Sequence, residues 1–332
     1  MKQVEERYIS LLTDFGFKRI FGTAMNKDLL ICFLNSLFNG KQVVRDVSYL
    51  NPEHVGDVYT DRKAIFDVYC EGENGEKFIV EMQNAYQTYF KDRSLFYSTF
   101  PIREQAPKGN DWNFKLNHVY TVALLNFNMN EDAFDKEKIR HHVQLCDTAT
   151  HKIFYDKLEF IYVEIAKFNK TLGELETLYE KWLYALKNLY KLTQRPKELC
   201  DKVFDRLFEE AEIAKFTPQE VREYEASKKA YRDIKNSIDT AKQEGLAEGM
   251  ELGMAKGMEK GRAQGMEEGM AKGMEKGRAQ GMEEGMEKGT IDEKIATAKR
   301  LLGMGVSDDQ VAAITLLPLK HIEKLKNSLN IK

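Results

Sequence analysis

Two neighbouring segments of the chain combine strand-like apolar sequence with a single carboxylate each. Residues 65–70 (IFDVYC) and 77–83 (KFIVEMQ) have the β-branched and aromatic content of strands, and the Asn74–Gly75 pair between them indicates a hairpin turn. Asp67 lies in the first segment and Glu81 in the second. A carboxylate inside an apolar strand is unfavourable unless something compensates it, and a divalent metal ion is the usual compensation where two carboxylates converge.

The length of the hairpin loop decides whether the two acids share a face of the sheet. A two-residue turn would place Asp67 opposite Met82, on the wrong face, because side chains alternate along a strand. A three-residue loop of residues 73–75 places Asp67 opposite Glu81, and its last residue is the glycine that such loops require. In this register Asp67, Glu81 and Gln83 line one face, with opposed Cβ atoms ~5 Å apart.

The pattern of Asp67 followed by Glu81-Met82-Gln83 resembles the PD-(D/E)xK nuclease signature. On its own this signature has low specificity. Other segments, in the same order, resemble one branch of that superfamily, the Rpn (recombination-promoting nuclease) family of transposase-like proteins. They are LLTDFGFKRIFG (residues 11–22), EMQNAYQTYFKDRSLFYST (81–99), LFEEAEIAKFTPQEVREYE (207–225) and the glycine-rich tail. The resemblance therefore covers nearly the whole chain.

The resemblance implies a fold, a cofactor and a set of site residues. It implies an α/β fold with a restriction-endonuclease-like αβββαβ core, and a metal-dependent DNA endonuclease activity. Asp67, Glu81 and the backbone carbonyl of Met82 would hold Mg²⁺ or Mn²⁺, and Asp67, Glu81 and Gln83 would be the catalytic residues. Gln83 stands where the wider superfamily has a lysine, a substitution common in this branch. Because an amide does not titrate near neutral pH, Gln83 can orient a water molecule but cannot deprotonate it.

Two residue pairs with helical spacing are further candidates. Asp14 and Lys18 lie one helical turn apart on the same face. They form a surface salt bridge, or else Lys18 lies near a phosphate of DNA or Asp14 near the metal. Arg93 and Tyr97 have the same spacing after the acidic strands. Arg93 can bind a phosphate bidentately, with Tyr97 stacking or hydrogen bonding beside it. The His141-His142 pair lacks a matching ligand set and is expected at the surface.

The overall composition limits the function classes. The chain has 332 residues, enough for two or three structural units, and a formal net charge of −3. This charge excludes a globally basic DNA-coating protein, so contacts with nucleic acid must come from local patches. The N-terminal MKQVEERYIS is not an apolar signal segment and no apolar run approaches membrane-spanning length, so we expect a cytoplasmic protein without membrane contact. The scattered cysteines indicate reduced thiols and no zinc site.

Hydrophobic periodicity predicts that residues 1–240 form one α/β domain with a helical extension. The order of elements is helix, strand, strand, strand, helix, strand, which is also the core order of the nuclease superfamily. The expected elements are a helix at 26–39, a strand at 43–50, the two acidic strands, a helix at 86–103, strands at 119–125 and 160–165, and helices from 172 to 239.

Residues 241–290 have a different pattern. Glycine recurs at every fourth position from Gly245 to Gly289, and GMAKGMEKGRAQGMEE occurs twice, at 253–268 and 269–284. Each interior glycine costs ~1 kcal/mol relative to alanine in a helix, yet the intervening residues are strong helix formers. Both facts fit a charged helix whose glycine stripe contacts another backbone in a right-handed supercoil, which makes the protein a homo-oligomer. The alternative is a flexible charged linker; the Lys and Glu content excludes a membrane-spanning GxxxG helix.

Residues 291–332 predict a small helical module. The first helix spans 291–304, residues 307–310 (SDDQ) fit a capping box that opens a second, and Pro318 lies near the start of a third. The module resembles a helix-turn-helix in outline. It is therefore either a DNA-contacting unit or a packing and dimerisation unit, which is the commoner use of three short helices.

Three function classes follow from these patterns. The first is a metal-dependent DNA endonuclease that hydrolyses phosphodiester bonds in recombination or mobile-element activity. The second is a DNA-binding protein that has lost cleavage. The third is an assembly protein whose glycine-repeat segment is the main functional part. The paired acids and the resemblance favour the first.

Overall fold

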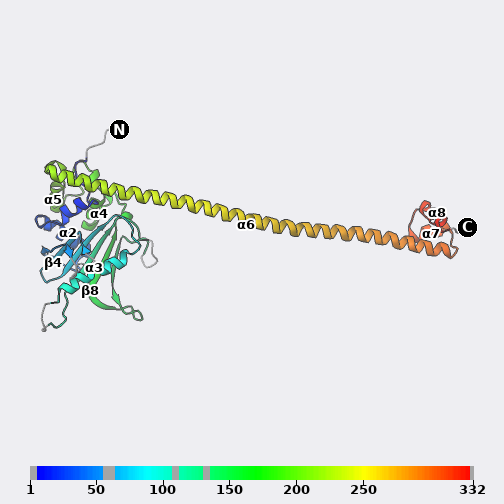
Figure 1. Ribbon diagram of the computed structural model, residues 1–332, viewed down its shortest axis with the longest axis horizontal. Coiled ribbons are helices and arrows are strands. Elements are labelled where there is room, and N and C mark those ends of the chain that lie inside the picture. The colour runs from blue at the N-terminus through cyan, green and yellow to red at the C-terminus, as the bar shows by residue number, and fades with distance from the viewer. Residues whose placement is uncertain (1–5, 55–63, 107–111, 130–134, 330–332) are drawn as a thin grey trace. The chain divides into compact units, whose positions relative to one another are not determined.

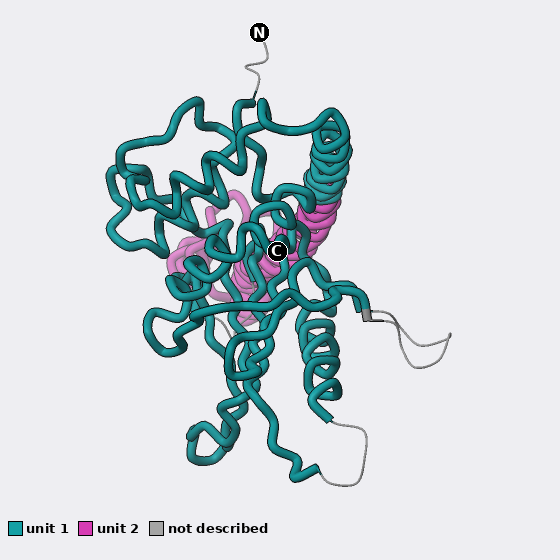
Figure 2. Tube along the Cα trace, turned by 90° about the vertical axis from the view of Figure 1, so that its left-hand side faces the viewer, with its two compact units in different colours: residues 1–243 teal, residues 244–332 magenta. Residues whose placement is uncertain are grey.

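The computed structural model describes residues 6–54, 64–106, 112–129 and 135–329. By its internal contacts the chain divides into two compact units, residues 1–243 and residues 244–332, which Figure 2 shows in different colours. The first unit contains both predicted acidic strands.

A mixed six-stranded sheet forms the centre of the first unit (Figure 1). Its strand order is β1-β4-β5-β6-β8-β7, with the β5–β6 and β6–β8 pairs parallel and the other pairs antiparallel. The strands are β1 (Val47–Tyr49), β4 (Val68–Gly72), β5 (Lys77–Gln83), β6 (Val119–Leu125), β7 (Arg140–Cys146) and β8 (Ile153–Glu164). A separate antiparallel pair consists of β2 (Glu53–His54) and β3 (Ala64–Ile65).

Helices cover both faces of the sheet. They are α1 (Asp14–Phe21), α2 (Lys27–Phe38), α3 (Phe90–Glu104), α4 (Leu178–Asn188), α5 (Lys202–Glu210) and the first part of α6 (Pro218–Gly303). Short 3₁₀ helices are η1 (Ala24–Asn26), η2 (Ile165–Lys167), η3 (Leu172–Glu174), η4 (Leu189–Lys191) and η5 (Ile213–Lys215). Val80 and Met82 of β5 point into the larger core, with α1, α2, α4 and α5. Ile79 points to the other face and packs near Tyr97 of α3.

The mixed α/β architecture predicted from the sequence is confirmed. The boundaries of several elements differ from the prediction. The strand expected at 43–50 is only Val47–Tyr49, and the helix expected from residue 86 begins at Phe90. The first acidic strand begins at Val68, so Asp67 precedes it, because Ile65 pairs in the separate β2–β3 ribbon.

The β7–β8 hairpin is the largest difference from the predicted fold. The strand expected at 160–165 extends back to Ile153, and its antiparallel partner β7 was not predicted. Most side chains of β7 are exposed and its register with β8 is irregular, as suits an edge strand with a weak apolar pattern. The expectation that His141 lies at the surface is wrong. Its Nε2 lies 2.8 Å from Oε1 of the fully buried Glu164, which also accepts a hydrogen bond from the Met129 amide.

The three-residue hairpin loop between β4 and β5 is confirmed. Val68 pairs with Val80, and the Gly72 amide donates to the Glu76 carbonyl over 2.8 Å, which continues the same register to the loop. Gly75 has a φ of +83°, and a Cβ atom there would lie 2.4 Å from Nδ2 of Asn117. The left-handed backbone conformation therefore favours glycine at this position.

The second unit contains the remainder of α6, α7 (Asp308–Thr315) and α8 (Leu319–Ser328). The predicted helix at 291–304 is not separate but forms the end of α6. Four buried residues form the small core of this unit: Ala298, Leu302, Val311 and Ile322. Ser307 precedes α7 as expected, but the capping box is not formed, since its hydroxyl donates to Oε1 of Gln310 over 3.0 Å.

The glycine-repeat segment lies entirely within α6. Its residues are exposed, and a Cβ atom added at any of the glycines from Gly245 to Gly289 would meet no atom within 4 Å. Within the described ranges, no helix combines the length and the apolar content that crossing a membrane requires.

Candidate active site

Asp67 and Glu81 meet where the β4–β5 ladder ends. The Asp67 amide donates to Glu81 Oε1 over 3.2 Å, and the Met82 amide donates to Asp67 Oδ2 over 2.8 Å. Gln83 Nε2 donates to Glu81 Oε2 over 3.2 Å. The three side chains that the sequence predicted to share a face are therefore close together.

The backbone of β5 explains why this end of the strand is polar. Lys77 donates its amide to His118, and Gln83 accepts from the Asn126 amide, so the odd-numbered residues of β5 bond with β6. The amide and carbonyl of Met82 therefore point toward β4, since backbone groups alternate sides along a strand. Because β4 begins only at Val68, the carboxylate of Asp67 takes the place of a strand carbonyl for the Met82 amide. The Met82 carbonyl lies on the same side as this carboxylate.

Burial makes the two carboxylates difficult to ionise together. Glu81 is only 6% exposed, and the side chain of Asp67 is 20% exposed. Burial, and then the charge of Asp67, raises the pKa of Glu81 to about 8. Burial also raises the pKa of Asp67, against the opposing effects of the Met82 amide and of Lys18. Such a pair holds a negative charge near neutral pH most easily when a cation binds between its oxygens.

The oxygen donors fit a hard divalent cation. Magnesium is typically bound in proteins through one or two carboxylates while it keeps several water molecules. Asp67 and Glu81 supply two carboxylates, and the Met82 carbonyl is a third oxygen on the same side. No group of three or more His, Cys, Asp or Glu side chains in the described part of the chain is arranged to hold a metal ion. Two carboxylates and one carbonyl thus suit a partly hydrated divalent cation.

Lys18 and Asp14 lie at the rim of the carboxylate pair. Lys18 Nζ is 3.8 Å from Asp67 Oδ1 and 2.6 Å from Asp14 Oδ1. The Asp14 side chain is 64% exposed and is paired with Lys18, although its charge contributes to the raised pKa of Asp67. Lys18 is therefore brought to the site, and Asp14 faces outward.

Arg93 and Tyr97 reach the site from α3, on the face of the sheet toward which Asp67 and Glu81 point. The positive charge of Arg93 opposes the raised pKa of both carboxyl groups. Its guanidinium lies 5.6 Å from the centre of the Tyr97 ring and donates to Gln87 Oε1 over 2.6 Å. Tyr97 in turn packs edge-on against Phe66, with ring centres 5.2 Å apart. One cation thus approaches the carboxylates from each side of the sheet.

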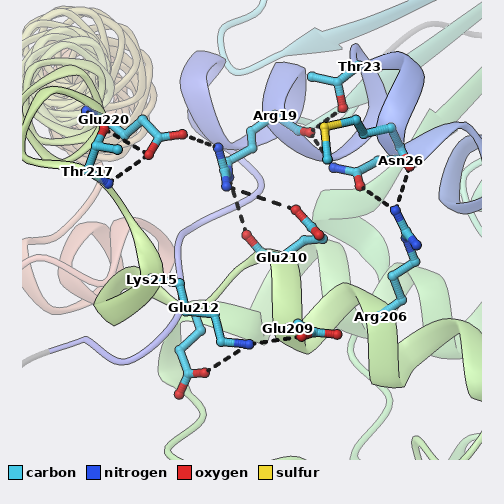
Figure 3. Close-up of polar contacts among 11 residues, drawn as sticks. Arg19, Thr23, Asn26, Arg206, Glu209, Glu210, Glu212, Lys215, Thr217 and Glu220 are labelled. Atoms are coloured by element: carbon cyan, nitrogen blue, oxygen red, sulfur yellow. Dashed lines mark hydrogen bonds and ion pairs between the residues drawn. The ribbon is translucent and has the colours of Figure 1, made fainter.

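Helix α1 is fixed in place by residues from the far end of the domain. Arg19, one residue after Lys18, forms an ion pair with Glu220 of α6 and donates from Nε to the Glu210 carbonyl over 3.3 Å (Figure 3). Its guanidinium also lies 4.3 Å from the centre of the Phe216 ring. Segments 11–22 and 207–225 are therefore in direct contact, and their packing holds Lys18 beside Asp67.

Three polar residues near the site were not identified from the sequence. Gln87 holds Arg93, as described above. Asn84 follows Gln83, donates to the Leu12 carbonyl over 2.7 Å, and accepts from Asn126 over 3.4 Å. Asn84 and Asn126 directly follow two neighbouring parallel strands, and amides in that position are a sequence signal that would have indicated their convergence.

Comparison with known proteins identifies the family of the chain. The profile of the PD-(D/E)XK nuclease family transposases matches residues 11–241, more than half of the chain, and this range contains the carboxylate pair, Gln83, Lys18, Arg93 and Tyr97. No curated protein and no solved structure gives a significant match. The family match and the mixed sheet with its paired acids agree. The chain belongs to the PD-(D/E)XK nuclease family transposases.

Proposed function

We propose that this protein is a metal-dependent endonuclease that hydrolyses phosphodiester bonds in DNA, in the service of recombination or mobile-element activity. The observation that carries the proposal is the opposition of Asp67 and Glu81 at the end of the β4–β5 ladder, beside the Met82 carbonyl. Family membership supports the nuclease class.

Asp67, Glu81 and the Met82 carbonyl would hold Mg²⁺ or Mn²⁺. When bound, the ion supplies positive charge for the scissile phosphate and lowers the pKa of a bound water molecule. Gln83 donates from Nε2 to Glu81, which leaves its side-chain carbonyl as an acceptor that can orient a water molecule.

The flanking cations complete the binding site for a phosphate. Lys18 supplies a positive charge beside Asp67. Arg93 supplies a planar guanidinium whose N–H groups can donate to two phosphate oxygens. Preorganised positive charge around the reacting phosphate stabilises the charge that develops in the transition state.

A plasmid-nicking assay tests the activity. Wild-type protein with Mg²⁺ should convert supercoiled DNA to open-circle and linear forms, and a chelator should abolish the conversion. Asp67→Ala and Glu81→Ala should each lower the rate by at least 100-fold. Asp92→Ala, which removes an exposed acid of α3, is the matched control and should cleave normally. Full cleavage by either site variant would rule out the metal-site assignment.

A second candidate function is assembly through the glycine repeat, with or without cleavage. It is favoured by the long exposed stretch of α6, whose surface carries glycines with open space above them and methionines such as Met254, Met258 and Met274 that are 72–82% exposed. Exposed apolar surface of this extent typically marks an interface. We propose that a second copy of the chain covers it. Sedimentation of the full chain and of a chain lacking residues 241–290 should give an oligomer and a monomer, respectively.

A further inference from the structure

A cleft of about 450 Å³ opens at the end of β5 that also carries Glu81 and Gln83. It lies at the C-terminal ends of β5 and β6 and is closed by Leu12, by η4 and by residues 231–239 of α6. Asn84 lines it directly after Gln83, and side chains at successive strand positions point to opposite faces. The cleft is therefore lined by the residue that follows Gln83, and it lies on the opposite face of β5 from Glu81.

A chain of polar groups forms part of the cleft lining. Asn126 donates from Nδ2 to the Tyr231 hydroxyl over 3.1 Å and to Asn84 Oδ1 over 3.4 Å. Among the described residues, neither Asn126 Oδ1 nor the Tyr231 O–H has a further partner. These groups offer one hydrogen-bond acceptor and one donor side by side, which is the pattern that a nucleobase edge complements.

The walls of the cleft are aromatic and apolar. Tyr86 and Phe127 pack edge to face, with ring centres 5.6 Å apart, and Tyr190 lies on the η4 side. Ile234 and Ile238 of α6 line the cleft and remain 44% and 41% exposed. Base faces stack on such side chains without regard to sequence, and these faces are accessible only in unpaired nucleotides.

Lysines give the cleft an excess of positive charge. It is lined by Lys187, Lys191 and Lys235 and by a single acid, Asp239. Lys187 donates to the Ala166 and Phe168 carbonyls; burial, and then the charge of Lys191, lowers its pKa. Lys191 and Lys235 form no ion pair with any carboxylate in the described ranges. Lys191 donates to Oδ1 of Asn188 over 3.0 Å and lies over the Tyr190 ring, but no acid neutralises its charge or that of Lys235, so both can attract an anion such as a phosphodiester.

We propose that this cleft binds an unpaired nucleotide of the nucleic-acid strand on which the protein acts, with its base between the aromatic walls and its phosphate at Lys191 and Lys235. The inference rests on the proposed function for the class of substrate. A cleft of this volume falls within the size range of small-ligand sites, about 300–1,000 Å³, and a double helix does not fit it. The site thus predicts a preference for single-stranded or frayed DNA next to the cleavage point.

The test compares two charge reversals of equal size in the full chain. Lys191→Glu/Lys235→Glu changes the cleft. Lys197→Glu/Lys229→Glu changes two exposed lysines outside it; Lys229 lies six residues before Lys235 on α6, about 120° around the helix. Binding of a fluorescein-labelled 20-mer, single-stranded or as a duplex, is followed by anisotropy in the presence of a chelator. Circular dichroism melts confirm that both variants remain folded.

The cleft variant should bind the single strand at least tenfold more weakly and the duplex less than threefold more weakly, whereas the control variant should change both by less than twofold. The proposal would be overturned if both variants lost DNA affinity equally. It would also be overturned if the cleft variant lost equal affinity for single strand and duplex. Displacement of the single strand by micromolar adenosine monophosphate would also overturn it, because the cleft would then hold a free nucleotide. Binding is measured without metal and without cleavage. If the protein shows these differences in binding but never cuts DNA, the proposal for the cleft stands and the proposed nuclease activity is wrong.

Discussion

The backbone amide of Met82 donates a 2.8 Å hydrogen bond to the Oδ2 atom of Asp67. This bond replaces a missing rung of the β4–β5 ladder and directs the other carboxylate oxygen of Asp67 toward Lys18, 3.8 Å away. The same strand end carries Glu81, which accepts from the Asp67 amide and from the Gln83 side chain, so main-chain amides and Gln83 together orient the acid pair.

Glu81→Gln should stabilise the metal-free protein at neutral and alkaline pH, because it removes an acid that must take up a proton on folding or, at higher pH, stay charged beside Asp67. The folded-state pKa of Glu81 is raised to about 8, so the folded protein holds a proton that the unfolded chain has released. Its contribution to stability is full below about pH 4.5 and is lost as the pH rises toward 8, at up to about 1.4 kcal/mol per pH unit. Denaturant melts from pH 5 to 9 in chelator should show a flatter pH dependence for Glu81→Gln than for wild type or Asp92→Asn. A variant with the slope of wild type would contradict the burial argument.

Mg²⁺ should raise the melting temperature of the wild-type protein and leave Glu81→Gln unchanged. An ion that binds only the folded state adds about 2.7 kcal/mol at a free concentration 100-fold above its Kd. Differential scanning calorimetry across a Mg²⁺ titration measures the effect, with Ca²⁺ as a second oxygen-seeking ion. An equal shift for both proteins would place the binding elsewhere in the chain.

Gln83→Lys should retain or raise the cleavage rate, and Gln83→Leu should lower it at least tenfold. The lysine adds a positive charge where negative charge develops, whereas leucine removes both the bond to Glu81 Oε2 and the acceptor for water. Single-turnover rates with saturating enzyme separate this effect from DNA affinity. If both variants cleave like wild type, Gln83 is a strand-end residue without a role in the reaction.

Lys18→Ala and Arg93→Ala should each flatten the salt dependence of DNA binding. Every phosphate contact that is lost lowers the slope of log K against log salt by about 0.9. Anisotropy titrations between 50 and 300 mM KCl give the slopes, and Lys197→Ala serves as an exposed control. Slopes that match wild type for both variants would remove the two residues from the phosphate-binding site.

Replacing the glycines from Gly245 to Gly289 with alanine should make the isolated segment helical even when dilute. Each replacement contributes about 1 kcal/mol of helix propensity, and no atom of the folded chain opposes the added methyl groups. The wild-type peptide should instead gain helix by circular dichroism as its concentration rises. A wild-type peptide that stays disordered at every concentration, together with a monomeric full-length protein, would favour the flexible-linker alternative.

The sequence alone determined the pairing of Asp67 with Glu81. Register in a hairpin depends on loop length and on a glycine at a left-handed position, and both are local properties that residues 73–75 display directly. The alternation of side chains then places Gln83 on the same face. The helix α2 and the buried strand β6 also follow from apolar periodicity, because each is buried through its apolar side chains.

What surrounds the acid pair was decided only by tertiary structure. Lys18 and Arg93 belong to helices on opposite faces of the sheet, and their approach depends on packing such as that of Arg19 against Glu220. The strand β7 and the burial of His141 escaped prediction because an edge strand with exposed side chains has no strong apolar pattern. Asn126 and Tyr231 are 105 residues apart and meet only because α6 folds back over the ends of the parallel strands. Local rules act through neighbouring residues, whereas contacts at such separations arise from the packing of whole elements.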